Sequence, residues 1–176
     1  LREQGLDNFV MKRFGLEPRL CTTCGGGMLE WARLVEAIKT PTSTVVVAIA
    51  GKYTALDDAY VSLISALVHC GAHSGVRVET RMVEVTNIEE GTEDPATVLA
   101  GVHAVIVPVG WGSRGAEGKI RCIEYVRKNK IPFLGICYGF QMAVIEYCRN
   151  VIGLKDATST EVDENATEPV VCILPE

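Results

Sequence analysis

The chain has 176 residues and a mass of 19.1 kDa, a length typical of one globular domain with a short attachment. Its net charge is −5 with no basic block, and no apolar run approaches a membrane-spanning length, so neither a nucleic-acid nor a membrane partner is expected. The chain has seven cysteines, an odd number, and they are spread through apolar segments. The first residues do not resemble a signal sequence, so we expect reduced thiols in a cytoplasmic protein.

Residues 1–40 differ in pattern from the rest of the chain. Apolar residues recur at helical spacing over 7–14 and 28–38, and a Pro- and Thr-rich stretch follows at 40–44. We therefore expect 1–40 to be a helical tail or linker and 41–176 to form one domain. The pair Cys21 and Cys24 has no second pair to complete a zinc site, so no metal centre is predicted.

From residue 45 onward, strand and helix patterns alternate. The predicted strands are 45–50, 75–85, 104–109 and 132–137, and the predicted helices are 57–70, 94–100, 117–130 and 138–149. This alternation predicts an α/β fold, an open and mostly parallel sheet with helices on both faces. Ligands of such sheets bind beyond the carboxyl ends of the strands, so the strand-to-helix turns are the candidate functional segments.

One of these turns has the spacing of a nucleophile elbow. Gly135, Cys137 and Gly139 form Gly-x-Cys-x-Gly between a buried strand and a helix. A side chain two residues before or after the nucleophile would collide with neighbouring backbone, and the helix N-terminus favours thiolate over thiol. The alternative, an inert buried cysteine, is usual for free cysteines, but the flanking glycines favour a nucleophile.

Two backbone N–H groups are candidate oxyanion donors for this cysteine. Tyr138 opens the helix, so its N–H has no intrahelical acceptor, and Gly110 lies in a Gly-rich turn at the same predicted edge of the sheet. Without Cys137 nearby, the turn around Gly110 would be interpreted as a flexible loop. Gln141 follows Cys137 by four residues and shares its helix face.

Seven short motifs together resemble one family, the glutamine amidotransferase part of the CTP synthases, preceded by the end of their synthetase part. They lie at 50–53, 58–60, 110–119, 131–137, 141–146, 149–151 and 156–161, and so extend over nearly the whole chain. Gly-x-Cys-x-Gly alone indicates only a class I glutaminase or a related cysteine hydrolase. Gly-Lys-Tyr at 51–53 and Ser-Thr-Glu at 159–161 restrict the resemblance to the CTP synthases. It implies a flavodoxin-like class I amidotransferase fold.

The resemblance also implies a mechanism. Cys137 attacks the side-chain amide of L-glutamine, forms a glutamyl thioester and releases ammonia, while Gly110 and Tyr138 hold the oxyanion. Gln141 and Glu161 bind the substrate. For Glu161 the reason is that a carboxylate suits the α-ammonium group of glutamine. From the sequence alone, Glu161 would be an ordinary exposed acid.

For the full enzyme, the resemblance implies a glutamine-hydrolysing ligase of pyrimidine biosynthesis. Its synthetase domain binds ATP, Mg and UTP and uses the ammonia to form CTP, and the enzyme is a homo-tetramer. GTP is its activator, and Trp111 is a candidate to stack on the guanine. The amidotransferase domain itself has no cofactor.

Three departures from the family pattern give further expectations. Val109 stands where the family has glycine, which predicts backbone strain if that position needs a positive φ. Tyr138 and Phe140 replace Leu and Met, and for Tyr138 only the backbone is needed.

The family's catalytic His-x-Glu pair is not found up to Glu176, and His69, His73 and His103 do not match it. His103 is expected at the amino end of a strand, and His73 in a loop after a helix. We therefore expect a domain that lacks its C-terminal part and has little turnover by itself.

Two other functions remain open on the sequence. One is a different enzyme on the same sheet, either another class I glutamine amidotransferase or a γ-glutamyl hydrolase. The other is a non-catalytic redox or regulatory domain, for which a reactive elbow cysteine would suffice.

Overall fold

The computed structural model describes residues 4–16, 27–56 and 58–172, and the predictions for Cys21 and Cys24 lie outside this part. The chain divides into two units, 1–36 and 37–176. In the first unit lies α1 (Leu6–Arg13), and α2 (Gly27–Lys39) extends across the division. None of the described helices has the length and apolar character needed to cross a membrane.

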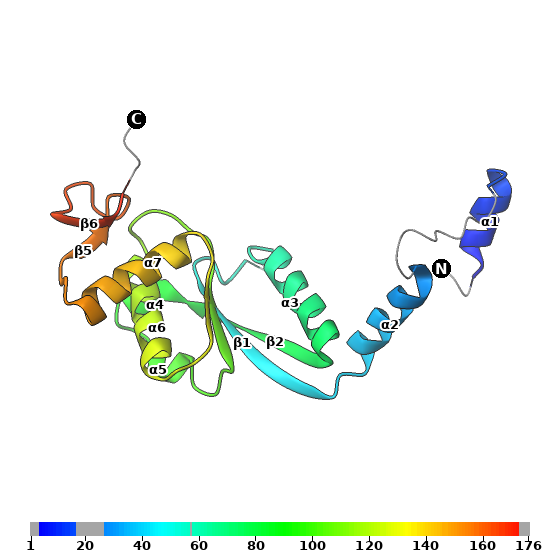
Figure 1. The fold of residues 1–176 in the computed structure, drawn as a ribbon, viewed down its shortest axis with the longest axis horizontal. Helices are drawn as coiled ribbons and strands as arrows, with labels where there is room; N and C mark the ends of the chain where they lie inside the picture. The colour runs from blue at the N-terminus through cyan, green and yellow to red at the C-terminus, as the bar shows by residue number, and fades with distance from the viewer. Residues whose placement is uncertain (1–3, 17–26, 57, 173–176) are drawn as a thin grey trace. The chain divides into compact units, whose positions relative to one another are not determined.

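The second unit is built on a four-stranded parallel sheet with strand order β2-β1-β3-β4 (Figure 1). Its strands are β1 (Ser43–Gly51), β2 (Val76–Glu84), β3 (Ala104–Val107) and β4 (Phe133–Gly135). The last residues of β1 and nearly all of β3 are buried, as their continuous β-branched and small apolar sequences predict. The predicted α/β class is confirmed.

Helices lie on both sides of this sheet. Figure 1 shows α3 (Val61–Ser74) on one side, and α4 (Val85–Glu89), α6 (Ala116–Lys128) and α7 (Tyr138–Tyr147) on the other. The short α5 (Pro95–Val98) begins at Asp94, whose carboxylate accepts the N–H of Ala96. A single apolar core joins the second side of the sheet to α4, α6 and α7.

Several boundaries differ from the sequence prediction. The helix predicted from residue 57 begins at Val61, because the described residues just before it, 58–60, form a turn. The helix continues to Ser74, where Gly75 ends it at φ 69°. His73 therefore lies inside α3 and not in a following loop. Four elements were not predicted: α4, a π-helical turn (Cys148–Ile152), β5 (Ala157–Ser159) and β6 (Glu168–Val171).

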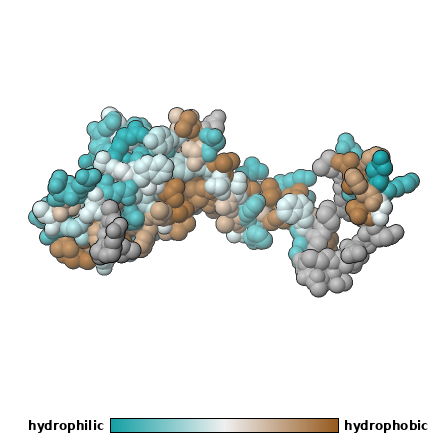
Figure 2. Space-filling view, turned by 90° about the horizontal axis from the view of Figure 1, so that it is seen from above, coloured by the Kyte–Doolittle hydropathy of each residue, from teal (hydrophilic) through white to brown (hydrophobic). Residues whose placement is uncertain are grey.

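The surface of this unit mixes hydrophilic and hydrophobic residues, and Figure 2 shows the hydrophobic ones gathered in patches. Leu134 of β4 and Phe140 of α7 are among the exposed large apolar side chains. Leu134 is exposed because α3 packs on β2, at the far end of the sheet from β4.

An ion pair joins α6 to α7. Glu146 is 1% exposed, and its carboxylate accepts from Nε and Nη2 of Arg127 at 2.7–3.0 Å and from the side-chain amide of Asn150. These hydrogen bonds to Glu146 raise the pKa of Arg127 above its usual value. The pair therefore satisfies a carboxylate that the packing of α7 has removed from water.

Replacing Arg127 by alanine should lower the free energy of unfolding by about 2–3 kcal/mol, because the buried Glu146 would lose its cation. Urea unfolding followed by circular dichroism measures the loss. Lys128→Ala is the matched control, since its pair with Glu124 is solvent-exposed and should contribute less than about 0.5 kcal/mol. Equal effects of the two substitutions would show that the ion pair does not hold α7 in place.

Candidate active site

Three loops meet at the carboxyl edge of the sheet. Lys52 directly follows β1, Pro108 directly follows β3, and Cys137 lies two residues after β4. Because all of these strands are parallel, their carboxyl ends lie at one edge. The sheet therefore brings together loops that are 56 and 29 positions apart in the sequence.

Cys137 has the backbone geometry of a strained turn. It is the N-cap of α7 with φ 53° and ψ −110°, and it is one of three described non-glycine residues with a positive φ. A residue held in this region costs on the order of 1–3 kcal/mol and persists only where the surrounding structure imposes it. Its side chain is exposed at the helix N-terminus, as the motif predicts.

The two flanking glycines are required by close backbone contacts. A Cβ on Gly139 would lie 1.9 Å from the carbonyl oxygen of Val107, and a Cβ on Gly135 would lie 2.8 Å from the backbone of Phe140. Neither neighbour can rotate away, because both contacts involve backbone atoms. The collisions predicted from the Gly-x-Cys-x-Gly spacing are therefore present in the fold.

The turn at 108–112 lies against the start of α7. Tyr138, which is 1% exposed, donates from its hydroxyl to the carbonyl of Gly112 at 2.5 Å. Burial, followed by the nearby carboxylates of Glu161 and Glu89, raises the pKa of Tyr138 to about 12, so the hydroxyl keeps its proton. The side chain of Tyr138 therefore has a contact of its own, which the prediction of a backbone role alone missed.

Val109 is not strained. It is absent from the described non-glycine residues with a positive φ, and Gly110 also lies outside that region. The prediction of backbone strain at Val109 is therefore wrong, because Val109 does not have a positive φ. The glycine with a positive φ in this turn is Gly112, at 73°.

Lys119 is a buried cation that the sequence prediction did not place in the site. It lies on α6 with its side chain directed at this turn, donating to the carbonyls of Pro108 at 3.0 Å and Val109 at 3.5 Å. The sequence does contain a signal for its burial. Lys119, Ile123 and Val126 are spaced four and then three residues apart, which places the lysine on the apolar face of α6.

Glu161 and Gln141 both lie near the turn and the elbow. Glu161 is exposed, and its Oε1 accepts the N–H of Gly112 at 2.9 Å. Gln141 is bonded through its backbone N–H to the carbonyl of Cys137, and its side-chain Oε1 is a buried acceptor with no partner among the described residues. The fold thus brings a carboxylate and a free amide oxygen to the region around Cys137.

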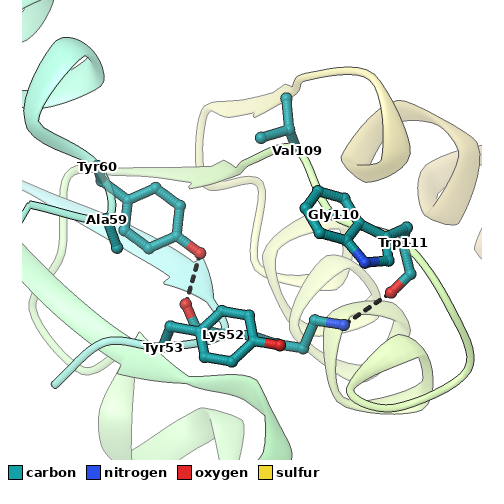
Figure 3. Close-up of a pocket in the computed structure, with 7 residues that line it drawn as sticks. All are labelled: Lys52, Tyr53, Ala59, Tyr60, Val109, Gly110 and Trp111. Carbon is teal, nitrogen blue, oxygen red and sulfur yellow. Dashed lines mark hydrogen bonds between the residues drawn. The ribbon is translucent and has the colours of Figure 1, made fainter. Parts of the chain in front are cut away.

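The loop after β1 supports the other side of the 108–112 turn. Lys52 donates to the carbonyl of Trp111 at 2.7 Å, and the hydroxyl of Tyr60 donates to the carbonyl of Lys52 at 2.7 Å (Figure 3). Further along this loop, Thr54 donates to Glu84 at the end of β2. Burial would raise the pKa of Glu84, but the hydrogen bonds from Thr54 and Thr86 outweigh it, so its pKa is lowered and it stays a carboxylate.

A pocket of about 120 Å³ opens between these two loops (Figure 3). Its lining consists of Lys52, Tyr53, Ala59, Tyr60, Val109, Gly110 and Trp111. Trp111 is 70% exposed, so its ring is accessible from solvent. The guanidinium of Arg114 lies 5.2 Å from the ring of Tyr53, which adds a positive charge at the rim.

The three histidines lie away from Cys137. Nδ1 of His103 accepts the backbone N–H of Val46, and the backbone N–H of His103 donates to the carbonyl of Val46. His103 therefore lies at the amino end of β3, as predicted. His69 and His73 are exposed in the last part of α3. Among the described residues, no group of three His, Cys, Asp or Glu side chains is placed to hold a metal ion.

The family model described as "Glutamine amidotransferase class-I" matches residues 55–172. This match includes the elbow, the 108–112 turn and Glu161, and the chain belongs to the class I glutamine amidotransferase family. It is also similar to a solved structure, the glutaminase domain of Trypanosoma brucei CTPS with bound acivicin, with 35% sequence identity and a TM-score of 0.65. The match covers 73% of this chain and 50% of that one, so this chain spans about half the length of that structure.

Proposed function

We propose that this domain hydrolyses L-glutamine with Cys137 as the nucleophile. The observation that carries the proposal is the elbow itself, an exposed cysteine held at φ 53° on the N-terminus of α7. The thiolate would attack the side-chain amide carbon, forming a C–S bond. The C–N bond would then break, and the departing nitrogen would take up a proton to leave as ammonia. Water would cleave the resulting thioester to give glutamate and the free thiol.

The negative charge that develops on the amide oxygen needs donors already in place. Tyr138 is the first residue of α7, so its N–H has no acceptor within the helix, and Gly110 lies in the turn packed on the same residue. Two such donors stabilise an oxyanion by several kcal/mol in acyl-transfer enzymes, about 3–4 for each. The proton transfers also need a base, and the described part of the chain places no histidine beside Cys137.

Glu161 and Gln141 are the proposed contacts for the rest of the substrate. The carboxylate of Glu161 is exposed beside the turn and suits the α-ammonium group of glutamine. The buried Oε1 of Gln141 can accept a hydrogen bond from a substrate N–H group, which would satisfy an acceptor that lacks a partner among the described residues.

Replacing Glu161 by glutamine should raise KM for glutamine about 10- to 100-fold with little change in kcat, because the charge–ammonium contact is made equally in the ground and transition states. The amide oxygen of the new side chain can still accept from Gly112, so the turn should keep its position. Steady-state kinetics with glutamine, on the protein as its gene encodes it, measure the effect. The nearby Glu164→Gln is the control, and an unchanged KM in Glu161→Gln would exclude this role.

The nucleophile is tested by covalent labelling with 6-diazo-5-oxo-L-norleucine, a glutamine analogue. The protein as its gene encodes it is incubated with the analogue, digested and mapped by mass spectrometry. We expect one adduct, on Cys137, that excess glutamine prevents. Cys70 and Cys172, which are also exposed, serve as internal controls for general thiol reactivity. The absence of an adduct on Cys137 would contradict the glutaminase function and favour a redox or regulatory domain.

We further propose that the ammonia serves CTP formation, as part of a glutamine-hydrolysing CTP synthase. The similarity to the T. brucei CTPS glutaminase domain supports this role. In such an enzyme a synthetase domain would bind UTP, ATP and Mg, and Trp111, exposed at the pocket rim, would stack on the guanine of GTP. A cytoplasmic homo-tetramer belongs to the same proposal.

The CTP synthase role is tested separately from glutamine hydrolysis. The full protein should aminate UTP in the presence of ATP with either glutamine or ammonia as the nitrogen donor. Hydrolysis of glutamine without amination of UTP by either donor would leave another class I amidotransferase or a γ-glutamyl hydrolase as the function.

A further inference from the structure

The side chains of Lys119 and Tyr138 hold the 108–112 turn from the inside of the protein. Both residues are 1% exposed, and they come from different helices, α6 and α7. The ammonium of Lys119 donates to two carbonyls at the start of the turn, and the hydroxyl of Tyr138 donates to the carbonyl of Gly112 at its end. The turn is thus fixed at both ends by buried donors.

Burying Lys119 in this place is costly. Among the described residues, no carboxylate forms an ion pair with it, and the ammonium faces backbone carbonyls and the ring of Tyr138, 5.0 Å from the ring centroid. Burial, together with the positive charge of Lys52, lowers the pKa of Lys119 to about 8, although the nearby Cys137 acts in the opposite direction. Packing alone would be served better by an apolar side chain, so the ammonium requires another explanation.

The peptide bond between Val109 and Gly110 supplies that explanation. In a trans peptide, the carbonyl and the N–H point in opposite directions within one plane. The carbonyl oxygen of Val109 accepts from Nζ of Lys119 at 3.5 Å, so the N–H of Gly110, on the opposite side of this peptide, faces away from the lysine. A flip of this peptide would remove an acceptor from the ammonium and turn the N–H toward a positive charge.

The position of Gly110 depends on the same two side chains. A Cβ on Gly110 would lie 2.8 Å from Nζ of Lys119 and 3.4 Å from the ring of Tyr138. The backbone of Gly110 is therefore packed directly against both groups. Since Tyr138 also carries the second candidate donor on its own backbone N–H, one residue links the two halves of the oxyanion hole.

We propose that Lys119 and the side chain of Tyr138 are positioning residues that set the orientation of the Val109–Gly110 peptide, and with it the N–H of Gly110 as an oxyanion donor. The proposal rests on the proposed glutaminase function. Neither side chain contacts the reacting atoms; each acts through the turn. The phenol hydroxyl and the ammonium are both needed, because each holds a different end of the segment.

Two substitutions separate this role from a general contribution to packing. Tyr138→Phe removes only the hydroxyl, and Lys119→Met keeps the length of the side chain but removes its charge and its donors. Tyr147→Phe on α7 and Lys128→Met on α6 are matched controls on the exposed faces of the same helices. All variants are made in the protein as its gene encodes it.

The first measurement is the kinetics of glutamine hydrolysis. We expect kcat to fall about 10-fold in Tyr138→Phe and about 100-fold in Lys119→Met, with KM within about 3-fold, because an oxyanion donor acts in the transition state. Lys119→Arg should recover part of kcat, since it restores a charged donor. The controls should stay within about 2-fold. An unchanged kcat in Tyr138→Phe and Lys119→Met, or a change confined to KM, would overturn the proposal.

The second measurement is hydrogen–deuterium exchange of the backbone amides at 110–113, which does not depend on activity. Exchange should become about 5- to 30-fold faster in Tyr138→Phe, the range expected when one hydrogen bond worth roughly 1–2 kcal/mol is lost. Unchanged exchange would overturn the proposal even if Lys119→Met failed to fold. A wild-type protein that is neither labelled by the glutamine analogue nor active on glutamine would contradict the proposed function. The exchange data would then still show whether the two groups hold the turn.

Discussion

Replacing Cys137 by glycine is expected to abolish glutamine hydrolysis and, at the same time, to raise the free energy of unfolding by about 1–2 kcal/mol. The loss of activity, at least about 10⁴-fold, follows from removing the proposed nucleophile, whose sulfur would form the thioester. The gain in stability follows from the backbone, because φ 53° and ψ −110° strain a cysteine but not a glycine. Urea unfolding and a glutaminase assay, both on one preparation of the protein as its gene encodes it, measure the two effects.

Cys70→Gly is the matched control for this experiment. Cys70 is exposed within the regular helix α3, where glycine is unfavourable, so the same substitution should lower the free energy of unfolding by about 0.5 kcal/mol and leave activity unchanged. Opposite signs for the two substitutions would establish that the elbow stores strain at its nucleophile. A destabilised Cys137→Gly would show that the cysteine side chain contributes more by packing than its backbone costs.

Replacing Gly139 by alanine is expected to lower the free energy of unfolding by more than about 3 kcal/mol, or to prevent folding. The added Cβ would lie 1.9 Å from the carbonyl oxygen of Val107 and 2.7 Å from its carbonyl carbon. Val107 is the last residue of β3, an internal strand of the sheet, so α7 would have to move as a unit and lose core contacts. Thermal and urea unfolding measure the loss.

Gly91→Ala separates this collision from the ordinary cost of replacing a glycine. Gly91 has a positive φ of 76°, and an added Cβ there would meet no heavy atom within 4 Å. Its replacement should therefore cost only the left-handed backbone, about 1–2 kcal/mol. Similar losses at Gly91 and Gly139 would mean that α7 can shift on the sheet without penalty.

Most of the layout of the site could be predicted from local pattern. The β-branched runs of β1 and β3 and the amphipathic helices between the strands predict a parallel sheet, and a parallel sheet places Cys137 and Gly110 at one edge. The boundaries were less accurate, as α3 shows. The spacing of apolar residues does not show that the helix begins only at Val61, or that the hydroxyl of Tyr60 donates to the carbonyl of Lys52.

The contacts between distant segments could not be predicted in the same way. Glu161 reaches Gly112 across 49 positions. The family resemblance singled out Glu161 for substrate binding, but the polar residues around it gave no sign that its carboxylate would accept the N–H of Gly112. Lys119 occupies an apolar position of α6, but its partners depend on how α6 packs against the end of β3. The backbone of Val109 likewise depends on how the whole turn is packed, so a family pattern at this one position predicts strain that the fold does not impose.

The amino-acid sequence by itself determined the class of fold, the nucleophile elbow and the need for glycine on both sides of Cys137. These are properties of short segments, in which periodicity and residue size set the local backbone. Only the tertiary structure decided that Lys119, Tyr138 and Glu161 converge on one turn. The reason is that such contacts depend on the packing of α6, α7 and the loop after β5 against the sheet, and the sum of many apolar contacts sets that packing.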